Sequence, residues 1–287
     1  MNIAKNKFDK IYIEISNICN LQCDFCPEVN RQKKIMSYEL FTKIIDQVKD
    51  LTKEVTFHLM GEPLAHPKIK EFVDYCAQAK LPINLTTNGT LLQNKNNIEV
   101  LLSPIIRQVN FSLQSLSANF TKKDAEQFLN KIFLFTERAF SERPDLYINY
   151  RLWNIGSDEM RNMVTGFRKS HRIKNRLYLH FDSRFNWPSL MSEESSDRGF
   201  CYGLKSHFGI HADGTVVPCC LDKEADIALG SVVTHNALEI LNNLRACNLR
   251  EGFARFELRE ELCRHCSFIR RFDKKMCANR DLISRTL

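Results

Sequence analysis

The chain has 287 residues, of which 44% are hydrophobic, and 41 basic against 34 acidic side chains give a net charge of +7. This length suits one large domain or a large and a small one, and the hydrophobic fraction excludes a disordered chain. No run of 18 apolar residues occurs, and the N-terminal sequence MNIAKNKFDK lacks the apolar segment of a signal peptide. We therefore expect a cytoplasmic protein without a membrane partner.

Eleven cysteines are many for a protein of a reducing compartment, where thiols more often bind metals or react than form disulfides. Cys76, Cys247 and Cys277 are scattered, and we interpret them as buried or bystander thiols. The others form groups near the two ends of the chain, which predicts two separate metal sites: Cys19, Cys23 and Cys26; Cys201, Cys219 and Cys220; Cys263 and Cys266.

Strand and helix patterns alternate through the first two-thirds of the chain. Helices are expected from about Ser37, from about Pro67, and near 121–139 and 157–170. Such alternation predicts an α/β fold with a parallel sheet, and six units are too few for a closed eight-unit barrel. The six predicted strands are 11–15, 55–60, 83–87, 108–113, 146–153 and 177–181.

A polar, serine-rich connection at 185–199 marks a change of character. Beyond it, HFGIHADGTVVPCC predicts a hairpin in which Asp213 and Gly214 make the turn, and helices are expected at 236–246 and 255–262. We therefore expect two domains, residues 1–185 and residues 186–287, with a small α+β second domain.

The stretch CNLQCDFC places Cys19, Cys23 and Cys26 directly after the first predicted strand. A four-iron cluster normally takes four thiolates, so three leave one iron open to a small molecule. A structural zinc site and ordinary buried thiols remain as alternatives.

Other polar residues also follow strands, and the carboxyl ends of parallel strands meet at one rim of a barrel. An active site is therefore expected at that rim. Its candidate residues are Gly61, Glu62 and Pro63, the segment 86–90, Ser112, Arg151, Asn154, His180 and Asp182.

The sequence CNLQCDFC resembles the signature of radical S-adenosylmethionine (SAM) enzymes, and MGEP, TTNG and FSLQS resemble further segments of that family. The resemblance spans roughly residues 8–185. It implies a partial (β/α)6 TIM-like barrel in which a 4Fe–4S cluster chelates SAM through its open iron. Reduction by a flavodoxin- or ferredoxin-type partner would cleave SAM to a 5′-deoxyadenosyl radical, which abstracts hydrogen from the substrate.

Carried over by position, the resemblance assigns the cluster to Cys19, Cys23 and Cys26. A glycine-rich adenine motif has no clear match here, and the segment 154–159 is a loose substitute. The alternatives are a core position for Phe25, a barrel salt bridge for Arg151, and a simple turn at Asn88–Gly89. The implied SAM-binding residues are Phe25 near the adenine, Gly61, Glu62 and Pro63 at the methionyl ammonium, Asn88, and Ser112 and Arg151 at the ribose or carboxylate.

The second group of cysteines looks like the auxiliary-cluster extensions called SPASM and twitch domains. A full SPASM domain has further cysteines, but Phe272 stands at one of those positions and only Cys277 follows, so we expect one auxiliary 4Fe–4S cluster. A four-thiolate zinc site is the alternative, Cys220 is an alternative ligand, and the role of Cys277 stays open. The expected ligands are Cys201, Cys219, Cys263 and Cys266.

An auxiliary cluster could take an electron from a substrate radical, which would make the reaction an oxidation, or assist a cleavage. We expect a small-molecule substrate, handled in a dehydrogenase-like or queuine-lyase-like reaction. Asp182 or His180 would accept the substrate proton, unless both are merely satisfied polar residues of the rim. Phe185 and Trp187 either line the pocket or pack in the core.

Three alternative functions remain. A peptide maturase is disfavoured because the chain enters its first strand by about Ile11, which leaves no room for a leader-binding domain. RNA modification rests on the basic clusters at 31–34, 168–176 and 270–275. A zinc-stabilised, non-catalytic binding module belongs to a different functional class.

Overall fold

The computed structural model describes residues 8–155, 170–193 and 195–272, and its centre is one ten-stranded sheet. The order of strands is β10-β9-β8-β1-β2-β3-β4-β5-β7-β6. Six neighbouring strands are parallel and coincide with the six predicted ones. They are β1 (Lys10–Ile13), β2 (Val55–Phe57), β3 (Ile83–Thr87), β4 (Ile106–Ser112), β5 (Tyr147–Ile155) and β7 (Leu177–Ser183).

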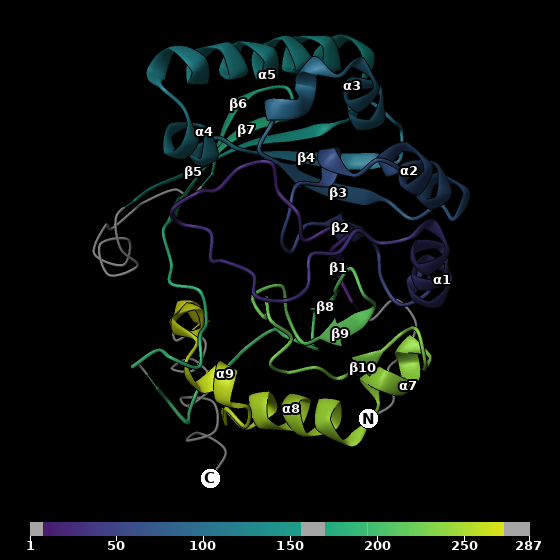
Figure 1. Cartoon of the computed structure of the whole chain (residues 1–287), viewed down its shortest axis with the longest axis vertical. Helices are drawn as coiled ribbons and strands as arrows, with labels where there is room; N and C mark the ends of the chain where they lie inside the picture. Colours follow the sequence, from purple (N-terminus) through teal and green to yellow (C-terminus); the bar gives the residue numbers. More distant parts are fainter. Residues whose placement is uncertain (1–7, 156–169, 194, 273–287) are drawn as a thin grey trace, which may run out of the picture.

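Helices cover the outer side of this sheet (Figure 1). Ser37 and Thr121 cap α1 and α5 by accepting hydrogen bonds from Leu40 N at 3.1 Å and Asp124 N at 3.3 Å, so both helices begin where the sequence predicts. The helices between the parallel strands are α1 (Tyr38–Val48), α2 (Ile69–Gln78), α3 (Lys95–Leu101), α4 (Gln114–Asn119) and α5 (Lys122–Glu142), with 3₁₀ turns η1 (Pro63–Ala65) and η2 (Thr90–Gln93).

The far edge of the sheet differs from the prediction. The helix expected at 157–170 lies outside the described residues except for Ser170, which begins strand β6 (Ser170–Lys174). This strand pairs antiparallel with β7, and Asn175 takes a left-handed conformation (φ 48°) in the turn between them. All five residues of β6 are exposed, so apolar periodicity gave no signal for it.

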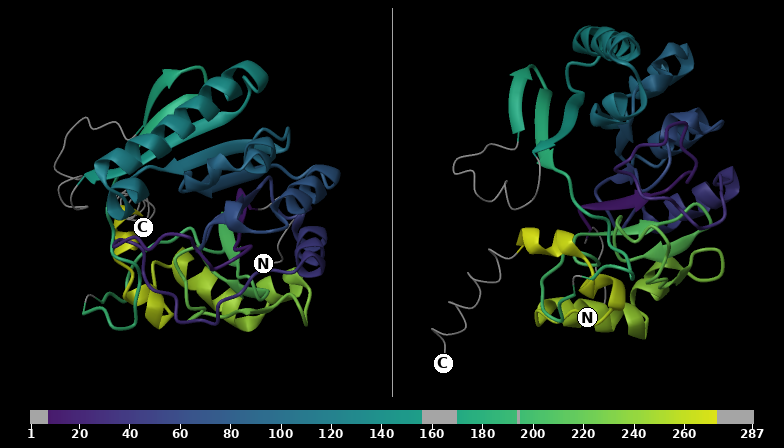
Figure 2. Two further views of the ribbon diagram at one scale, coloured as in Figure 1. Left: turned by 45° about the horizontal axis from the view of Figure 1, so that its top comes forward. Right: turned by 60° about the vertical axis from the view of Figure 1, so that its left-hand side comes forward.

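The C-terminal part continues the same sheet on the other side of β1. Strand β8 (His207–Ile210) pairs parallel with β1, and β9 (Thr215–Val217) pairs antiparallel with β8 through the predicted turn, where Gly214 has a φ of 89°. The short strand β10 (Gly230–Ser231) ends the sheet. Figure 2 shows the C-terminal segment beside β1, at the opposite end of the sheet from α5. Backbone hydrogen bonds therefore join the two predicted domains, 1–185 and 186–287, in one sheet. The division of the chain at residue 185 stays a prediction.

One C-terminal helix was predicted at the wrong place. The helices are α7 (Ala237–Leu241), α8 (Leu244–Ala254) and α9 (Glu261–Arg264), followed by the 3₁₀ turn η3 (Ser267–Phe272). Of the helix expected at 255–262, only the last two residues, Glu261 and Leu262, are helical. Asn243 caps α8 by accepting from Ala246 N at 2.9 Å. The helix ends before Phe256, whose φ of 61° no helix accommodates.

The inner face of the sheet is crossed by the long loop between β1 and α1, which carries the first cysteine group (Figure 1). Arg31 of this loop forms a salt bridge of 2.9 Å with the buried Glu14 and so fixes the loop to β1. Arg31 of the basic cluster 31–34 is therefore engaged inside the protein and does not present its charge to a nucleic acid. No helix among residues 8–155, 170–193 and 195–272 is long and apolar enough to cross a membrane.

Candidate active site

The inner face of the sheet forms the floor of a cavity of about 490 Å³. Successive residues of a strand point to opposite faces, and on these strands every second residue is polar or aromatic and lines the cavity. The floor consists of Lys10 and Tyr12 (β1), Thr56 (β2) with His58 directly after that strand, Asn84 and Thr86 (β3), Gln108, Asn110 and Ser112 (β4), Asn149, Arg151 and Trp153 (β5), His180 and Asp182 (β7) and His207 (β8).

A ladder of amide side chains holds the centre of this floor. Asn110 Nδ2 donates to Asn84 Oδ1 at 2.7 Å, and Asn110 Oδ1 accepts from Asn149 Nδ2 and from Gln108 Nε2, both at 2.9 Å. These residues are cross-strand neighbours in β3, β4 and β5, so the ladder fixes their side chains in place. Because these amides bind one another, they hold the cavity floor rigid and have few hydrogen-bonding groups left for a ligand.

The first cysteine group lies on the loop after β1, as predicted, and all three thiols line the cavity. Cys19 and Cys26 are exposed and Cys23 is half-buried. Segments from distant parts of the chain hold this loop: Arg184 Nη1 contacts Asp24 Oδ2 at 3.2 Å, and Trp187 Nε1 donates to Phe25 O at 3.2 Å.

Amide groups donate directly to the sulfurs of this loop. Asn119, at the end of α4, donates from Nδ2 to Cys23 Sγ at 3.0 Å and accepts from Gln22 N at 3.0 Å. Asn88 Nδ2 lies 4.0 Å from Cys19 Sγ. Such donors stabilise thiolates and tune iron–sulfur clusters, so the surroundings of these thiols match a cluster-binding role. Without metal, burial together with repulsion from Cys23 and Cys19 raises the pKa of Cys26 to about 11.

The segment Gly61–Glu62–Pro63 packs against the cysteine loop. Gly61 has a φ of 77°, and a Cβ there would lie 2.2 Å from Ser16 O, so only glycine fits. Glu62 N donates to Ile18 O at 3.0 Å. The assignment of this segment to the methionyl ammonium stays a prediction.

The Glu62 carboxylate is 2% exposed and accepts three hydrogen bonds, from Thr87 Oγ1 at 2.7 Å, Asn88 N at 2.8 Å and Leu64 N at 3.0 Å. Burial raises its pKa, and these bonds oppose that rise. Glu62 thus shapes the turn that carries Asn88, whose Nδ2 also donates to Asn20 Oδ1 at 3.0 Å. The Asn88–Gly89 turn is therefore present, and it faces the cavity as well.

Aromatic rings form one wall of the cavity. Phe25 contacts Trp153 with ring centroids 5.0 Å apart, Trp153 contacts Phe185 at 5.5 Å, and Phe185 contacts Trp187 at 5.6 Å. All four line the cavity, so Phe185 and Trp187 wall the pocket instead of filling the core. A flat, polarisable wall of this kind suits a planar heterocycle, which agrees with the predicted place of adenine near Phe25.

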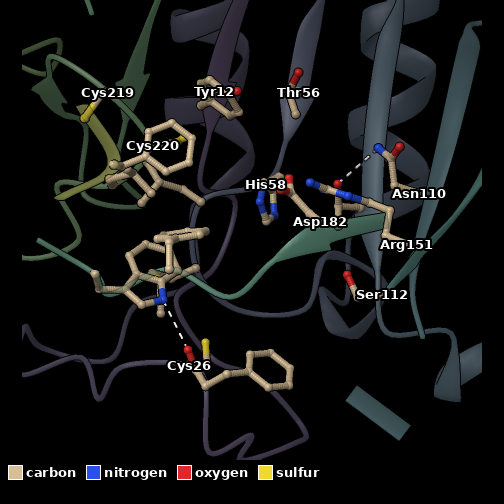
Figure 3. Close-up of a pocket in the computed structure, with 18 of the residues that line it drawn as sticks. Tyr12, Cys26, Thr56, His58, Asn110, Ser112, Arg151, Asp182, Cys219 and Cys220 are labelled. Atoms are coloured by element: carbon tan, nitrogen blue, oxygen red, sulfur yellow. Dashed lines mark hydrogen bonds between the residues drawn. The ribbon is translucent and has the colours of Figure 1, made fainter. Parts of the chain in front are cut away.

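The second cysteine group meets the cavity from the opposite side (Figure 3). Burial raises the pKa of Cys219 well above its usual value, and the thiols of Cys201, Cys220, Cys263 and Cys266 add to the effect by charge repulsion. All five of these cysteines line the cavity. In the described part of the chain, no three His, Cys, Asp or Glu side chains are placed to hold a single metal ion. A four-iron cluster binds each thiolate on a different iron and needs no such convergence.

Cys220, the alternative ligand, also lines the cavity. Its thiol is hydrogen-bonded to the hydroxyl of Tyr12 from β1, and this bond lowers the Cys220 pKa against the effect of burial. Figure 3 shows Tyr12 beside Cys220. Cys277 lies outside the described residues.

The two candidate bases lie on β7 and line the cavity. Asp182 is 6% exposed; its Oδ1 accepts from Ser183 N at 2.9 Å and lies 3.3 Å from Arg271 Nη1. The guanidinium of Arg271 thus engages the carboxylate of Asp182 on the cavity floor. His180 is the cross-strand neighbour of Arg151. Their catalytic role stays a prediction.

Arg151 and Ser112 are cross-strand neighbours in β5 and β4, and both face the cavity. Within the described residues, no hydrogen bond or salt bridge holds the Arg151 guanidinium, so the predicted alternative of a barrel salt bridge is not found there. Two further polar atoms, Thr56 Oγ1 and Gln114 Oε1, are buried without a hydrogen-bond partner and line the same space. Unpaired buried groups around a cavity are costly unless a ligand satisfies them.

Several residues of this site escaped the sequence analysis, among them Lys10, Tyr12, Thr56, His58 and Asn119. Four of them alternate with apolar residues in β1 and β2, and this period of two was the available signal. Asn119 carries no signal, because only the fold brings it to a loop 96 residues earlier.

Two family descriptions match the chain. Residues 13–150 match the radical SAM superfamily, and residues 201–267 match the SPASM iron–sulfur cluster-binding domain. The chain therefore belongs to the radical SAM superfamily and carries a SPASM-type domain, which makes it a radical SAM enzyme with SAM, a 4Fe–4S cluster and auxiliary iron–sulfur binding as its cofactors.

Among curated proteins, the chain is 33% identical over 89 residues to the tungsten-containing aldehyde ferredoxin oxidoreductase cofactor-modifying protein of Pyrococcus furiosus, covering 30% of this chain and 25% of that protein. It is 34% identical over 120 residues to the GTP 3′,8-cyclase of Microcystis aeruginosa, covering 39% of this chain and 36% of that enzyme. The chain thus spans well under half the length of these two relatives.

Solved structures share the fold. BtrN in complex with AdoMet and 2-DOIA has a TM-score of 0.61 at 16% identity, and the match covers 93% of this chain and 94% of BtrN. SuiB of Streptococcus suis bound to the precursor peptide SuiA has a TM-score of 0.56 at 17% identity, covering 92% and 70%. This likeness confirms the predicted α/β fold with a partial TIM-like barrel.

Proposed function

We propose that this enzyme cleaves SAM at a cluster held by Cys19, Cys23 and Cys26 and acts on a small molecule bound in the cavity. One observation carries the proposal: a single cavity is lined by both groups of cysteines. The thiols of the β1 loop are the more exposed, and the second group closes the opposite side. A substrate between them would face both sites at once.

The two groups of cysteines provide the ligands that two iron–sulfur clusters need. Soft thiolates in sets of three and four are the ligands that iron–sulfur clusters take. The buried, unpaired Gln114 Oε1 and the aromatic wall fit a polar, heterocyclic cofactor such as SAM. When bound, these cofactors supply one-electron reduction and hydrogen-atom abstraction, with electrons from a flavodoxin- or ferredoxin-type protein.

The residues of this chain position the reactants and exclude water. The amide ladder keeps the floor rigid, the aromatic wall shields one side, and Cys201, Cys219, Cys263 and Cys266 would hold one auxiliary 4Fe–4S cluster. An electron acceptor beside the substrate favours a net oxidation, with His180 or Asp182 holding the released proton; cleavage is the second outcome. Asp182 could do so only once Arg271 moves away from it.

A peptide substrate is the second candidate, because the structure of SuiB, which shares this fold, contains a precursor peptide. The substrate of the cyclase relatives, GTP by their name, favours a small molecule instead. RNA has less support here, since Arg31 and Arg271 of the basic clusters are engaged in salt bridges.

The test is anaerobic reconstitution followed by measurement of iron, sulfide and 5′-deoxyadenosine formed from SAM and a strong reductant. We expect about eight irons per chain, four for each cluster, with release of deoxyadenosine. About four irons with cleavage would leave the C-terminal cysteines to zinc. Absence of both iron and cleavage would refute the proposed function.

A further inference from the structure

Arg151 is a cation within the floor of the cavity that the protein does not neutralise directly. The carboxylate that acts on it most strongly is Asp182, which already contacts Arg271 at 3.3 Å. Burial opposes the charged form of Arg151 and lowers its pKa. Because a buried guanidinium without a paired anion costs free energy, a ligand that brings an anion would relieve that cost.

Lys10 faces the same region from β1. Burial lowers the pKa of His58, and the charges of Arg151 and Lys10 lower it as well, so that it is about 3. Lys10 likewise acts on His207, whose pKa is about 4. Both imidazoles are thus neutral near pH 7, and the positive charge of this region resides on Lys10 and Arg151. Figure 3 shows His58 beside Arg151 and Asp182.

Hydrogen-bond donors accompany these cations. Thr56, between Lys10 and the amide ladder in strand order, is 4% exposed and its hydroxyl has no partner in the described structure. An arginine presents a planar fork of donors that matches a carboxylate or a phosphate, and a lysine adds a point charge. Two cations and an unpaired hydroxyl around one space make an oxyanion site.

Lys10 and Arg151 also both act on the thiol of Cys220, which lines the same cavity. Arg151 acts on the pKa values of Tyr12 and Cys220, which belong to the C-terminal side of the cavity. The charges that act on Cys23 and Cys26 are instead Asp24, Lys223 and the neighbouring thiols. An anion at Arg151 could thus be the substrate's, whereas the assignment of Arg151 to the ribose or carboxylate of SAM stays a prediction, and the test below compares the two.

We propose that Arg151, Lys10 and Thr56 form an oxyanion subsite, and that the substrate is a small molecule carrying a carboxylate or a phosphate group. This inference rests on the proposed function, in which the same cavity holds the substrate. It places the anionic end of the substrate against the part of the cavity floor that β1, β2 and β5 form. The opposite end would then reach the more exposed β1 loop.

The test is calorimetric titration of the anaerobically reconstituted enzyme, both without SAM and saturated with SAM, against inorganic phosphate and, separately, acetate, with chloride holding the ionic strength constant. We expect one anion per chain, and an apparent Kd at least tenfold higher in Arg151→Met. The matched control is Arg138→Met, which removes an exposed arginine of α5 and should bind as the wild type does. Preference for phosphate would identify a phosphate-bearing substrate, and preference for acetate a carboxylate.

Three results would overturn the subsite: no anion binding to the wild type, unchanged binding in Arg151→Met, or anion binding that SAM abolishes, which would return Arg151 to the cofactor. Melting temperatures without anion separate binding from folding. Arg151→Met should melt no lower than the wild type, because it removes a buried unpaired charge, whereas a fall would assign Arg151 a structural role. Iron content and deoxyadenosine formation are measured on the same samples. Loss of either would count against the proposed function, whereas normal values without anion binding would count against the subsite alone.

Discussion

The two groups of cysteines are held in different ways. Cys19, Cys23 and Cys26 lie on a single loop, two of them exposed, and side-chain amides donate to their sulfurs. The second group comes from separate segments, is less exposed, and depends on tertiary packing to bring the thiols together. The cysteines of the open site can thus come from one loop, whereas those of the closed site meet only when the C-terminal part of the chain folds.

The largest expected effect would come from breaking the open site. Cys23→Ala should lower the iron content from about eight to about four per chain, and deoxyadenosine formation should fall by at least about a thousandfold. The control is Cys76→Ala, which removes a thiol buried in α2 away from both groups. Iron content and deoxyadenosine rate measure both variants. Retention of SAM cleavage in Cys23→Ala would contradict the assignment.

Breaking the closed site should spare the open one. The double variant Cys263→Ala/Cys266→Ala should also lose about four irons but keep deoxyadenosine formation within about fivefold of the wild type, while substrate conversion stops. The two variants together sharpen the comparison, because they lose the same amount of iron and differ in cleavage. Complete loss of iron from the double variant would show that the sites do not form independently.

A smaller effect is expected from the backbone that supports the open site. Gly61→Ala would place a Cβ 2.2 Å from Ser16 O at a φ of 77°, so the segment must shift. We expect a loss of about 2–4 kcal/mol in the free energy of unfolding and weaker SAM binding. Chemical denaturation and a SAM titration measure the two quantities. Wild-type values for both would mean that the close approach of Gly61 to Ser16 does not matter.

The smallest effect should come from Asn119, which donates to Cys23 Sγ at 3.0 Å. Asn119→Ala removes this donor, so the midpoint potential of the open-site cluster should become more negative, by on the order of tens of millivolts. Ser117→Ala, an exposed position of the same helix, serves as the control. A redox titration followed by electron paramagnetic resonance measures the shift. An unchanged potential in Asn119→Ala would leave that amide with a purely structural role.

Local patterns in the sequence predicted where the segments of the open site lie, whereas their roles stay predictions. Its three cysteines, the Gly61 segment and the Asn88 turn lie at strand ends that apolar runs mark clearly, so their meeting at one rim follows from parallel strand order. The hairpin around Gly214 was predictable for the same reason, since its turn residues carry their own conformational preference.

Other features depend on contacts that no local pattern records. Strand β6 is exposed along its whole length, and the end of α8 is set by the left-handed Phe256, so the helix expected at 255–262 was placed wrongly. Asp182 contacts Arg271, which lies 89 residues away in the sequence, and no local pattern indicates this pairing. The unpaired state of Arg151 likewise becomes visible only once its neighbours are placed.

The central claim is that one cavity lies between an open cluster site and a closed one. The most direct test is electron paramagnetic resonance of the reduced, reconstituted enzyme with and without SAM, on the wild type and on the two cysteine variants. We predict two cluster signals, of which SAM changes one, and that signal is absent from Cys23→Ala and present in Cys263→Ala/Cys266→Ala. A SAM-sensitive signal that survives in Cys23→Ala, or that disappears with Cys263 and Cys266, would contradict the account.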